Sequence, residues 1–163
     1  MIVPGPLHDP STQATHDHGR CVRAAMSEAL ALCATRGVRL TDLRQQVLEL
    51  IWHSRHAPIG AYAIMERLAA RRGKVAPPTV YRALEFLTRE GLVHRIDSLN
   101  AYVGCPAPRQ QHTAYFLICR RCGDAAEFRD DRLAAAIGAC AGQAGFRLDT
   151  ATVELTGTCA RCR

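Results

Sequence analysis

The sequence predicts an α+β fold that is divided into two small domains. The chain has 163 residues, of which 48% are hydrophobic, enough to build a packed core. Its first half shows apolar residues at helical spacing and then two short strand-like runs. Its second half alternates strand-like runs with one helical segment. Between the halves, residues 105–112 contain two prolines and read as a hinge.

The first half is predicted to contain four helices and a hairpin. Thr41 is a typical N-cap residue, and apolar residues follow it at helical spacing. Gly37 and Gly91 stand where helices are expected to end. Cys33 has no cysteine partner nearby and is expected in the core. The predicted elements are a helix at 21–36, a helix starting at 41, a helix at 60–73, a helix at 78–90, and strands at 92–97 and 101–105.

The helix at 78–90 has an apolar face and a polar face, and the hairpin follows it. This arrangement is typical of a winged helix-turn-helix, which inserts such a helix into the major groove of DNA. Tyr81 and Arg82, with Thr79 on the same face, are expected to meet base edges and phosphates, and Arg95 on the hairpin a phosphate. Residues 21–104 carry 12 Arg or Lys against 7 Asp or Glu, which favours an anionic partner. The alternative is an ordinary charged surface helix.

Four cysteines form two C-x-x-C pairs in the second half, and each pair follows a strand-like run. Two such turns supply a tetrahedral set of four thiolates, which suits a closed structural zinc site. The alternatives are two disulfides or free thiols, and disulfides are disfavoured in a chain with no secretion signal. The predicted ligands are Cys119, Cys122, Cys159 and Cys162.

The rest of the second half is predicted to form a small α/β unit around this zinc site. Strands are expected at 113–118, 125–129 and 146–156, with a helix at 130–144. Leu133, Ile137 and Cys140 are predicted to form the inner face of that helix. A unit of this size leaves a strand edge exposed, so a homodimer is expected.

A second set of possible ligands falls where the two predicted domains should meet. It consists of His94 on the hairpin, Cys105 and His112 at the two ends of the hinge, and Glu127 after the first C-x-x-C pair. Each has an ordinary alternative as a surface or loop residue. Together they offer one sulfur, two nitrogens and one oxygen, which suits zinc. A metal held by both domains would fix their relative orientation.

The chain resembles the ferric uptake regulator (Fur) superfamily, and within it most closely the zinc uptake regulator (Zur) branch. The residues that carry the resemblance are Arg39-Leu-Thr-x-x-Arg44, Pro77-Pro-Thr-Val-Tyr-Arg-Ala-Leu84, Gly91-Leu-Val-His94 and the four C-x-x-C cysteines. The resemblance extends from about residue 21 to the C-terminus. A single His112, rather than a His-rich run, precedes the first C-x-x-C pair and favours the zinc branch. A thiolate at Cys105 favours it too.

The resemblance implies a zinc-responsive repressor that binds operator DNA as a homodimer and controls zinc uptake genes. It implies two Zn²⁺ per chain, with Cys119, Cys122, Cys159 and Cys162 in the structural site and His94, Cys105, His112 and Glu127 in the regulatory site. The DNA-contacting residues are then Thr79, Tyr81, Arg82, Arg44 and Arg95. The predicted organisation is a disordered tail at 1–20, a winged-helix DNA-binding domain at 21–104, a hinge at 105–112, and a dimerisation and metal-binding domain at 113–163.

Parts of the same pattern also fit other functions. A sensor of iron, manganese or peroxide with the same fold is the main alternative. An enzyme is disfavoured because both ligand sets already hold four protein groups, whereas a catalytic zinc keeps an open position for water. A zinc-ribbon interaction module is disfavoured by the basic first half. The chain is expected to be cytoplasmic, with no membrane segment and no small organic substrate.

Overall fold

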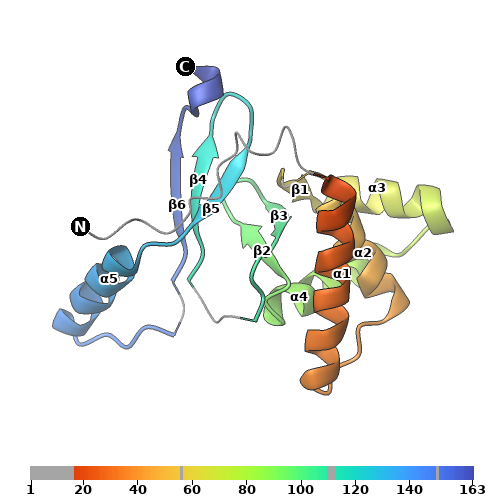
Figure 1. Cartoon of the computed structure of the whole chain (residues 1–163), viewed down its shortest axis with the longest axis horizontal. Coiled ribbons are helices and arrows are strands. Elements are labelled where there is room, and N and C mark those ends of the chain that lie inside the picture. The colour runs from red at the N-terminus through yellow and green to blue at the C-terminus, as the bar shows by residue number, and fades with distance from the viewer. Residues whose placement is uncertain (1–16, 56, 110–112, 150) are drawn as a thin grey trace. The chain divides into compact units, whose positions relative to one another are not determined.

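The computed structural model describes residues 17–55, 57–109, 113–149 and 151–163 (Figure 1). It divides into two compact units, one containing the described residues up to 109 and the other residues 113–163. The predicted α+β class is confirmed, because each unit combines helices with a three-stranded sheet. Among the described residues, no helix has both the length and the apolar character needed to cross a bilayer.

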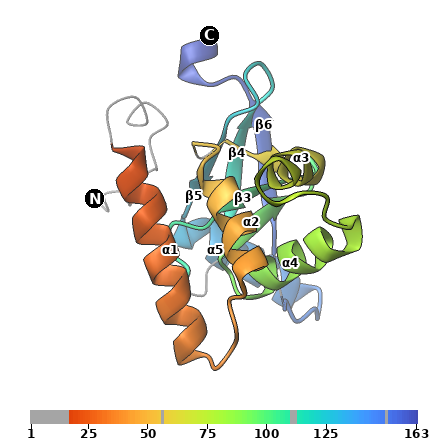
Figure 2. The same ribbon diagram turned by 90° about the vertical axis from the view of Figure 1, so that its right-hand side faces the viewer.

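The N-terminal unit is a helical bundle that packs against a small antiparallel sheet (Figures 1 and 2). The strand order is β1-β3-β2, and β2 and β3 form the hairpin expected of a wing. Its elements are α1 (His18–Thr35), α2 (Asp42–Trp52), β1 (Ile59–Gly60), α3 (Ala61–Arg72), α4 (Pro77–Arg89), β2 (Val93–Ile96) and β3 (Ala101–Gly104).

The apolar residues that recur at helical spacing in the sequence form one continuous core in this unit. Val47 and Ile51 of α2, Ile64 of α3 and Leu87 of α4 are at most 1% exposed, and Cys33 is buried as predicted. Full burial of such side chains contributes about 1.5–3 kcal/mol each to folding. The N-terminal unit therefore has a hydrophobic core of its own.

The first helix begins earlier than predicted, so the expected tail at 1–20 is wrong at its end. Helix α1 starts at His18 because the Asp17 carboxylate accepts a hydrogen bond from the backbone N–H of Arg20, which caps the helix. The ring of His18 also lies 2.8 Å (Nε2 to O) from the carbonyl of Trp52. Residues 1–16 of the predicted tail lie outside the described residues.

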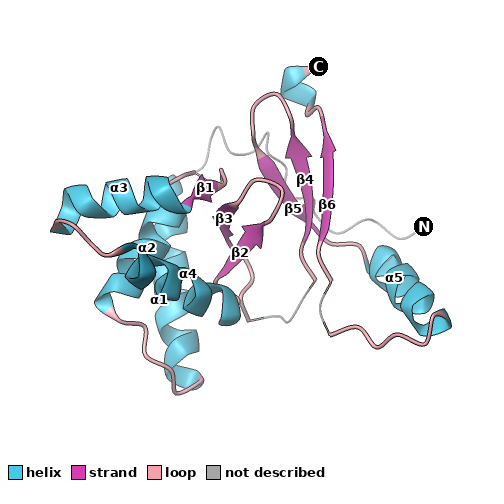
Figure 3. Cartoon of the chain, turned by 180° about the vertical axis from the view of Figure 1, so that it is seen from behind, coloured by secondary structure: helices cyan, strands magenta, loops and turns pink. Residues whose placement is uncertain are grey.

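The C-terminal unit is a three-stranded sheet with one helix (Figure 3). The strand order is β5-β4-β6, with β4 antiparallel to β5 and parallel to β6. Its elements are β4 (Tyr115–Cys119), β5 (Ala125–Phe128), α5 (Asp131–Gln143), β6 (Val153–Gly157) and a short 3-10 helix (Ala160–Cys162).

Two predictions for this unit are wrong. The strand expected at 146–156 begins only at Val153, and Phe146 and Leu148 are exposed before it. Cys140 was expected in the core but is exposed, because no residue of α5 is buried. Leu133 and Ile137 are half-buried, as is Ala141 on the same face, so the periodicity identified the correct side of α5 but not how deeply it is covered.

Candidate metal centre and nucleic-acid interface

The sheet of the C-terminal unit explains why the two C-x-x-C pairs meet. Because β4 and β6 are parallel, their carboxyl ends lie at the same edge of the sheet, with Cys119 paired with Gly157 in register. The first pair follows β4 directly, and the second follows β6 and forms the 3-10 helix. The prediction that the four cysteines come together is therefore confirmed.

The geometry of the four sulfurs fits a tetrahedral metal. All four lie within 4.8 Å of one another, and the Sγ atoms of Cys122 and Cys159 are 3.8 Å apart. A Zn–S bond of about 2.3 Å requires an edge of about 3.8 Å between sulfurs in a tetrahedron. Four thiolates form a soft, closed donor set of the kind that binds zinc.

Backbone groups prepare one of these sulfurs for metal binding. The N–H of Cys159 donates to Cys119 Sγ at 3.4 Å. This bond, with another from the N–H of Cys122, lowers the pKa of Cys119 to about 5, so the thiolate is favoured. In the absence of a metal, hydrogen bonding to the Cys159 sulfur raises the pKa of Cys162 to about 12.

Side chains connect the two C-x-x-C loops independently of any metal. Arg161 of the second loop donates to the carboxylate of Asp124, which follows the first loop. Arg121 of the first loop donates to the carbonyl of Cys162, and the N–H of Arg120 donates to Gly157 O at 2.9 Å. Sequence reasoning missed these contacts, although arginines within both C-x-x-C pairs were a visible signal.

The second predicted ligand set has two members in the N-terminal unit. A ring nitrogen of His94, on β2, and the sulfur of Cys105, directly after β3, lie within 4.8 Å of each other. Cys105 is 2% exposed, and its N–H donates to Leu92 O at 3.0 Å. The hairpin brings these two residues together, because His94 pairs with Val103 in the antiparallel register.

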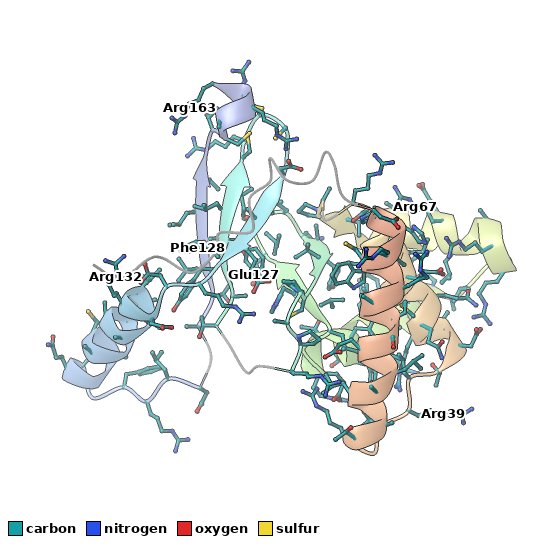
Figure 4. All side chains as sticks on the ribbon, viewed as in Figure 1. Arg39, Arg67, Glu127, Phe128, Arg132 and Arg163 are labelled. Carbon is teal, nitrogen blue, oxygen red and sulfur yellow. The ribbon has the colours of Figure 1, made fainter. Side chains whose placement is uncertain are left out.

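The other two members of this set belong to the C-terminal unit or fall outside the described residues. Glu127 lies on β5, opposite Phe116 of β4, and its carboxylate is 3.9 Å from Arg129 (Figure 4). His112 lies outside the described residues.

Gly104, just before Cys105, allows the ring of Trp52 to lie close to the backbone. A Cβ atom at Gly104 would lie 2.5–2.9 Å from atoms of the Trp52 ring, which is closer than real contacts allow. The indole therefore packs directly on the backbone of the residue that precedes the candidate ligand.

The candidate DNA-reading face of α4 is exposed. Pro77 stands at the start of the helix, as its fixed φ favours. Thr79, Tyr81 and Arg82 lie on the exposed face, and Tyr81 is 44% exposed. The opposite face of α4 is buried as predicted, with Val80, Ala83, Leu84 and Leu87 in the core.

Two other predicted DNA contacts have partners within the protein. The guanidinium of Arg44 lies 3.6 Å from the centre of the Phe86 ring, and it donates to the carbonyl of Arg39. Arg95 is exposed on β2, where it forms an ion pair of 2.9 Å (Nε to Oδ1) with Asp97. Arg44 therefore packs against α4, whereas Arg95 lies at the surface of the wing.

Comparison with known proteins identifies the family. The ferric uptake regulator family matches residues 35–156. The chain belongs to the ferric uptake regulator family. It is 38% identical over 138 residues to the zinc uptake regulation protein of Escherichia coli (strain K12), covering 84% of this chain and 80% of that protein.

Two solved structures are similar in both fold and sequence. One is a zinc uptake regulator complexed with zinc and DNA, with a TM-score of 0.82 and 37% identity over 86% of this chain and 94% of the other. The other is the crystal structure of holo XcZur, with a TM-score of 0.76 and 40% identity over 88% of this chain and 96% of the other. A ferric uptake regulation protein of E. coli (strain K12) is 30% identical and covers 78% of this chain and 86% of that protein.

Proposed function

We propose that this protein is a cytoplasmic, zinc-responsive repressor that binds operator DNA as a homodimer and controls zinc uptake genes. The observation that carries the proposal is that the chain holds two separate groups of candidate ligands, the pair His94 and Cys105 and a set of four cysteines. One set of ligands suits a permanent structural ion, and the other suits an ion that is exchanged. The relatives named for zinc uptake regulation support the choice of metal.

The regulatory site of this proposal is made of His94, Cys105, His112 and Glu127. A thiolate and imidazoles favour zinc over hard cations such as Mg²⁺ or Mn²⁺. Bound there, zinc supplies a link between residues that are far apart in the chain. A ligand that binds one arrangement of the protein more tightly shifts the population toward it. Zinc thereby increases the fraction of protein that is competent to bind DNA.

DNA recognition is assigned to α4 and the wing. Tyr81 and Arg82 would contact base edges and phosphates, with Thr79 beside them, and Arg95 would contact a phosphate. The zinc- and DNA-bound relative supports this assignment. Since Arg44 lies on Phe86, its contribution to DNA binding acts mainly by holding α4 in place.

The homodimer is assigned to the C-terminal unit. Within the described residues β6 pairs only with β4, so its other edge is available to a partner strand. Leu117 and Leu155 are paired in register on neighbouring strands, and both are more than 40% exposed. Phe146 is 67% exposed in the same unit. A second copy would cover these apolar side chains, and two winged helices would then match a palindromic operator.

The test combines metal content with operator binding. Wild-type protein is expected to hold two Zn²⁺ per chain, of which a mild chelator removes one, and to lose operator affinity when that one is removed. Cys105→Ser should keep the structural ion and the fold but no longer respond to zinc. Arg82→Ala should lower discrimination between operator and mismatched DNA by about 1–3 kcal/mol.

A normal zinc response in Cys105→Ser would exclude the regulatory site as assigned. The second candidate function is a sensor of iron, manganese or peroxide, which the 30% identity to a ferric uptake regulation protein favours. Competition between Zn²⁺, Fe²⁺ and Mn²⁺ for the exchangeable site separates these functions, because the zinc sensor should retain zinc against an excess of either ion.

A further inference from the structure

The segment that carries Cys105 is joined to the end of the recognition helix by backbone hydrogen bonds. The N–H of Cys105 donates to Leu92 O at 3.0 Å, and the N–H of Leu92 donates to Leu87 O at 2.9 Å. Leu87 lies in the last turns of α4 and is fully buried. Two consecutive hydrogen bonds therefore lead from the candidate zinc ligand to α4, entirely within the N-terminal unit.

Arg36 adds a second connection between the same two segments. It is the C-cap residue of α1, and its guanidinium donates to Glu90 O at 2.6 Å and lies 3.4 Å from Glu90 Oε2. Glu90 is the C-cap of α4, where a cation is favoured by the helix dipole and by the unsatisfied carbonyls. The same guanidinium donates to Pro108 O at 3.5 Å, three residues beyond Cys105.

A neighbouring ion pair holds the same stretch of linker against α1. Both guanidinium nitrogens Nε and Nη2 of Arg109 face the carboxylate of Glu28, a two-point contact that fixes orientation as well as distance. Residues 105–109 are thus attached to the N-terminal unit at Cys105, at Pro108 and at Arg109. This part of the predicted hinge behaves as an extension of the DNA-binding unit.

We propose that Arg36 is a positioning residue that couples the zinc-ligand segment around Cys105 to the recognition helix α4. Because one guanidinium binds both the C-terminus of α4 and the linker carbonyl, a shift of the linker on metal binding is transmitted to α4. This inference rests on the proposed function. It adds the contacts through which metal binding near Cys105 would affect α4. Among the residues that the structure describes, the guanidinium of Arg36 contacts Glu90 and Pro108 rather than Cys105 or Arg82.

The test measures coupling, not affinity alone. Operator affinity is determined for wild type and Arg36→Ala with the exchangeable site filled with Zn²⁺ and with it emptied by chelator. Arg36→Ala is expected to reduce the zinc-dependent gain in operator affinity by about 2- to 30-fold, the range seen for residues that carry coupling between sites. Arg36→Lys keeps the charge with one donor group and should recover part of the gain.

The matched control is Arg39→Ala, which removes the same charge from an exposed position three residues away (Figure 4). Its effect on operator affinity should be equal with and without zinc, so its coupling stays at the wild-type value. Arg109→Ala should reduce coupling in the same direction as Arg36→Ala. The double variant should lose less than the sum of the two single losses, because both act through one segment.

The effect of operator DNA on zinc affinity gives an independent measurement of the same coupling. A residue with a purely structural role would not change it. If Arg36 carries coupling, operator DNA must increase zinc affinity by a factor that falls in Arg36→Ala by the same ratio. A variant that is merely less stable shows a lower Tm with both ratios intact, and this result would overturn the inference. Absence of any zinc effect in the wild type would instead overturn the proposed function.

Discussion

The two units of this chain reach stability by different means. In the N-terminal unit, helices and wing share an apolar core in which many side chains are almost completely buried. In the C-terminal unit, α5 has no buried residue, and Leu117, Phe146, Leu148 and Leu155 are exposed. A unit with so little core needs additional constraints, and a metal held by the four cysteines at one edge of the sheet would supply one. We therefore expect the folding of the C-terminal unit to depend on a bound metal more than that of the N-terminal unit.

The largest expected effect comes from removing one structural ligand. Cys122→Ser should prevent metal binding by the C-terminal unit and unfold it, because the free energy of metal binding at a structural site contributes directly to folding. The N-terminal unit should remain folded. Circular dichroism together with limited proteolysis measures this, with a protected fragment of about residues 17–109 as the expected product.

Leu84→Ala is the matched change in the other unit. Leu84 is 1% exposed, and its truncation should lower the free energy of unfolding of the N-terminal unit by about 2–5 kcal/mol. Zinc bound at the four cysteines should not change. If Cys122→Ser instead unfolds both units together, the separation of their stabilities is wrong.

A smaller effect is expected from a charge on the exposed sheet of the C-terminal unit. Leu155→Asp should weaken self-association at least about tenfold, since a buried, unpaired charge at an interface is costly. Leu30→Asp on α1 is the control, because Leu30 and Leu155 are each 46% exposed. Sedimentation equilibrium measures both variants. Equal weakening by the two would place the interface elsewhere.

The smallest effect is expected from the ion pair between the C-x-x-C loops. Arg161→Ala removes its contact with Asp124 and should speed release of the structural metal to a chelator about two- to fivefold, because exposed pairs contribute little. The control is Arg163→Ala, which removes a charge close to Arg161 in the chain (labelled in Figure 4). No hydrogen bond or ion pair is found for the Arg163 side chain among the described residues. Release at the wild-type rate from Arg161→Ala would show that the contact between Arg161 and Asp124 does not help to hold the metal.

Sequence reasoning succeeded where a local pattern determines the structure. The buried face of α4 followed from its spacing, and the meeting of the four cysteines followed from two C-x-x-C pairs after two strands. The start of α1 was missed because the capping signal of Asp17 lies in a polar stretch without periodicity. Cys140 is exposed although its position predicted burial, because the spacing of apolar residues identifies one face of a helix but not what covers that face.

Contacts between residues that are distant in the chain could not be predicted from the sequence either. Nothing local indicates that Arg36 meets both Glu90 and Pro108, 54 and 72 residues away. The contact of Arg44 with Phe86 was not foreseen for the same reason, since it depends on how α2 and α4 pack. The role of Arg44 in DNA binding stays a prediction. The assignment of His94, Cys105, His112 and Glu127 to one regulatory site stays a prediction.

The close packing of Trp52 on Gly104 has a spectroscopic consequence. Trp52 is the only tryptophan of the chain, so the tryptophan emission of the protein comes from one indole, whose ring lies against the residue next to Cys105. A change in the path of the backbone at residues 104–105 alters the surroundings of that ring directly. Trp52 therefore lies next to a proposed zinc ligand and can report metal binding through its fluorescence. The rate of metal binding to the wild-type protein can then be measured by stopped-flow mixing without chemical labelling.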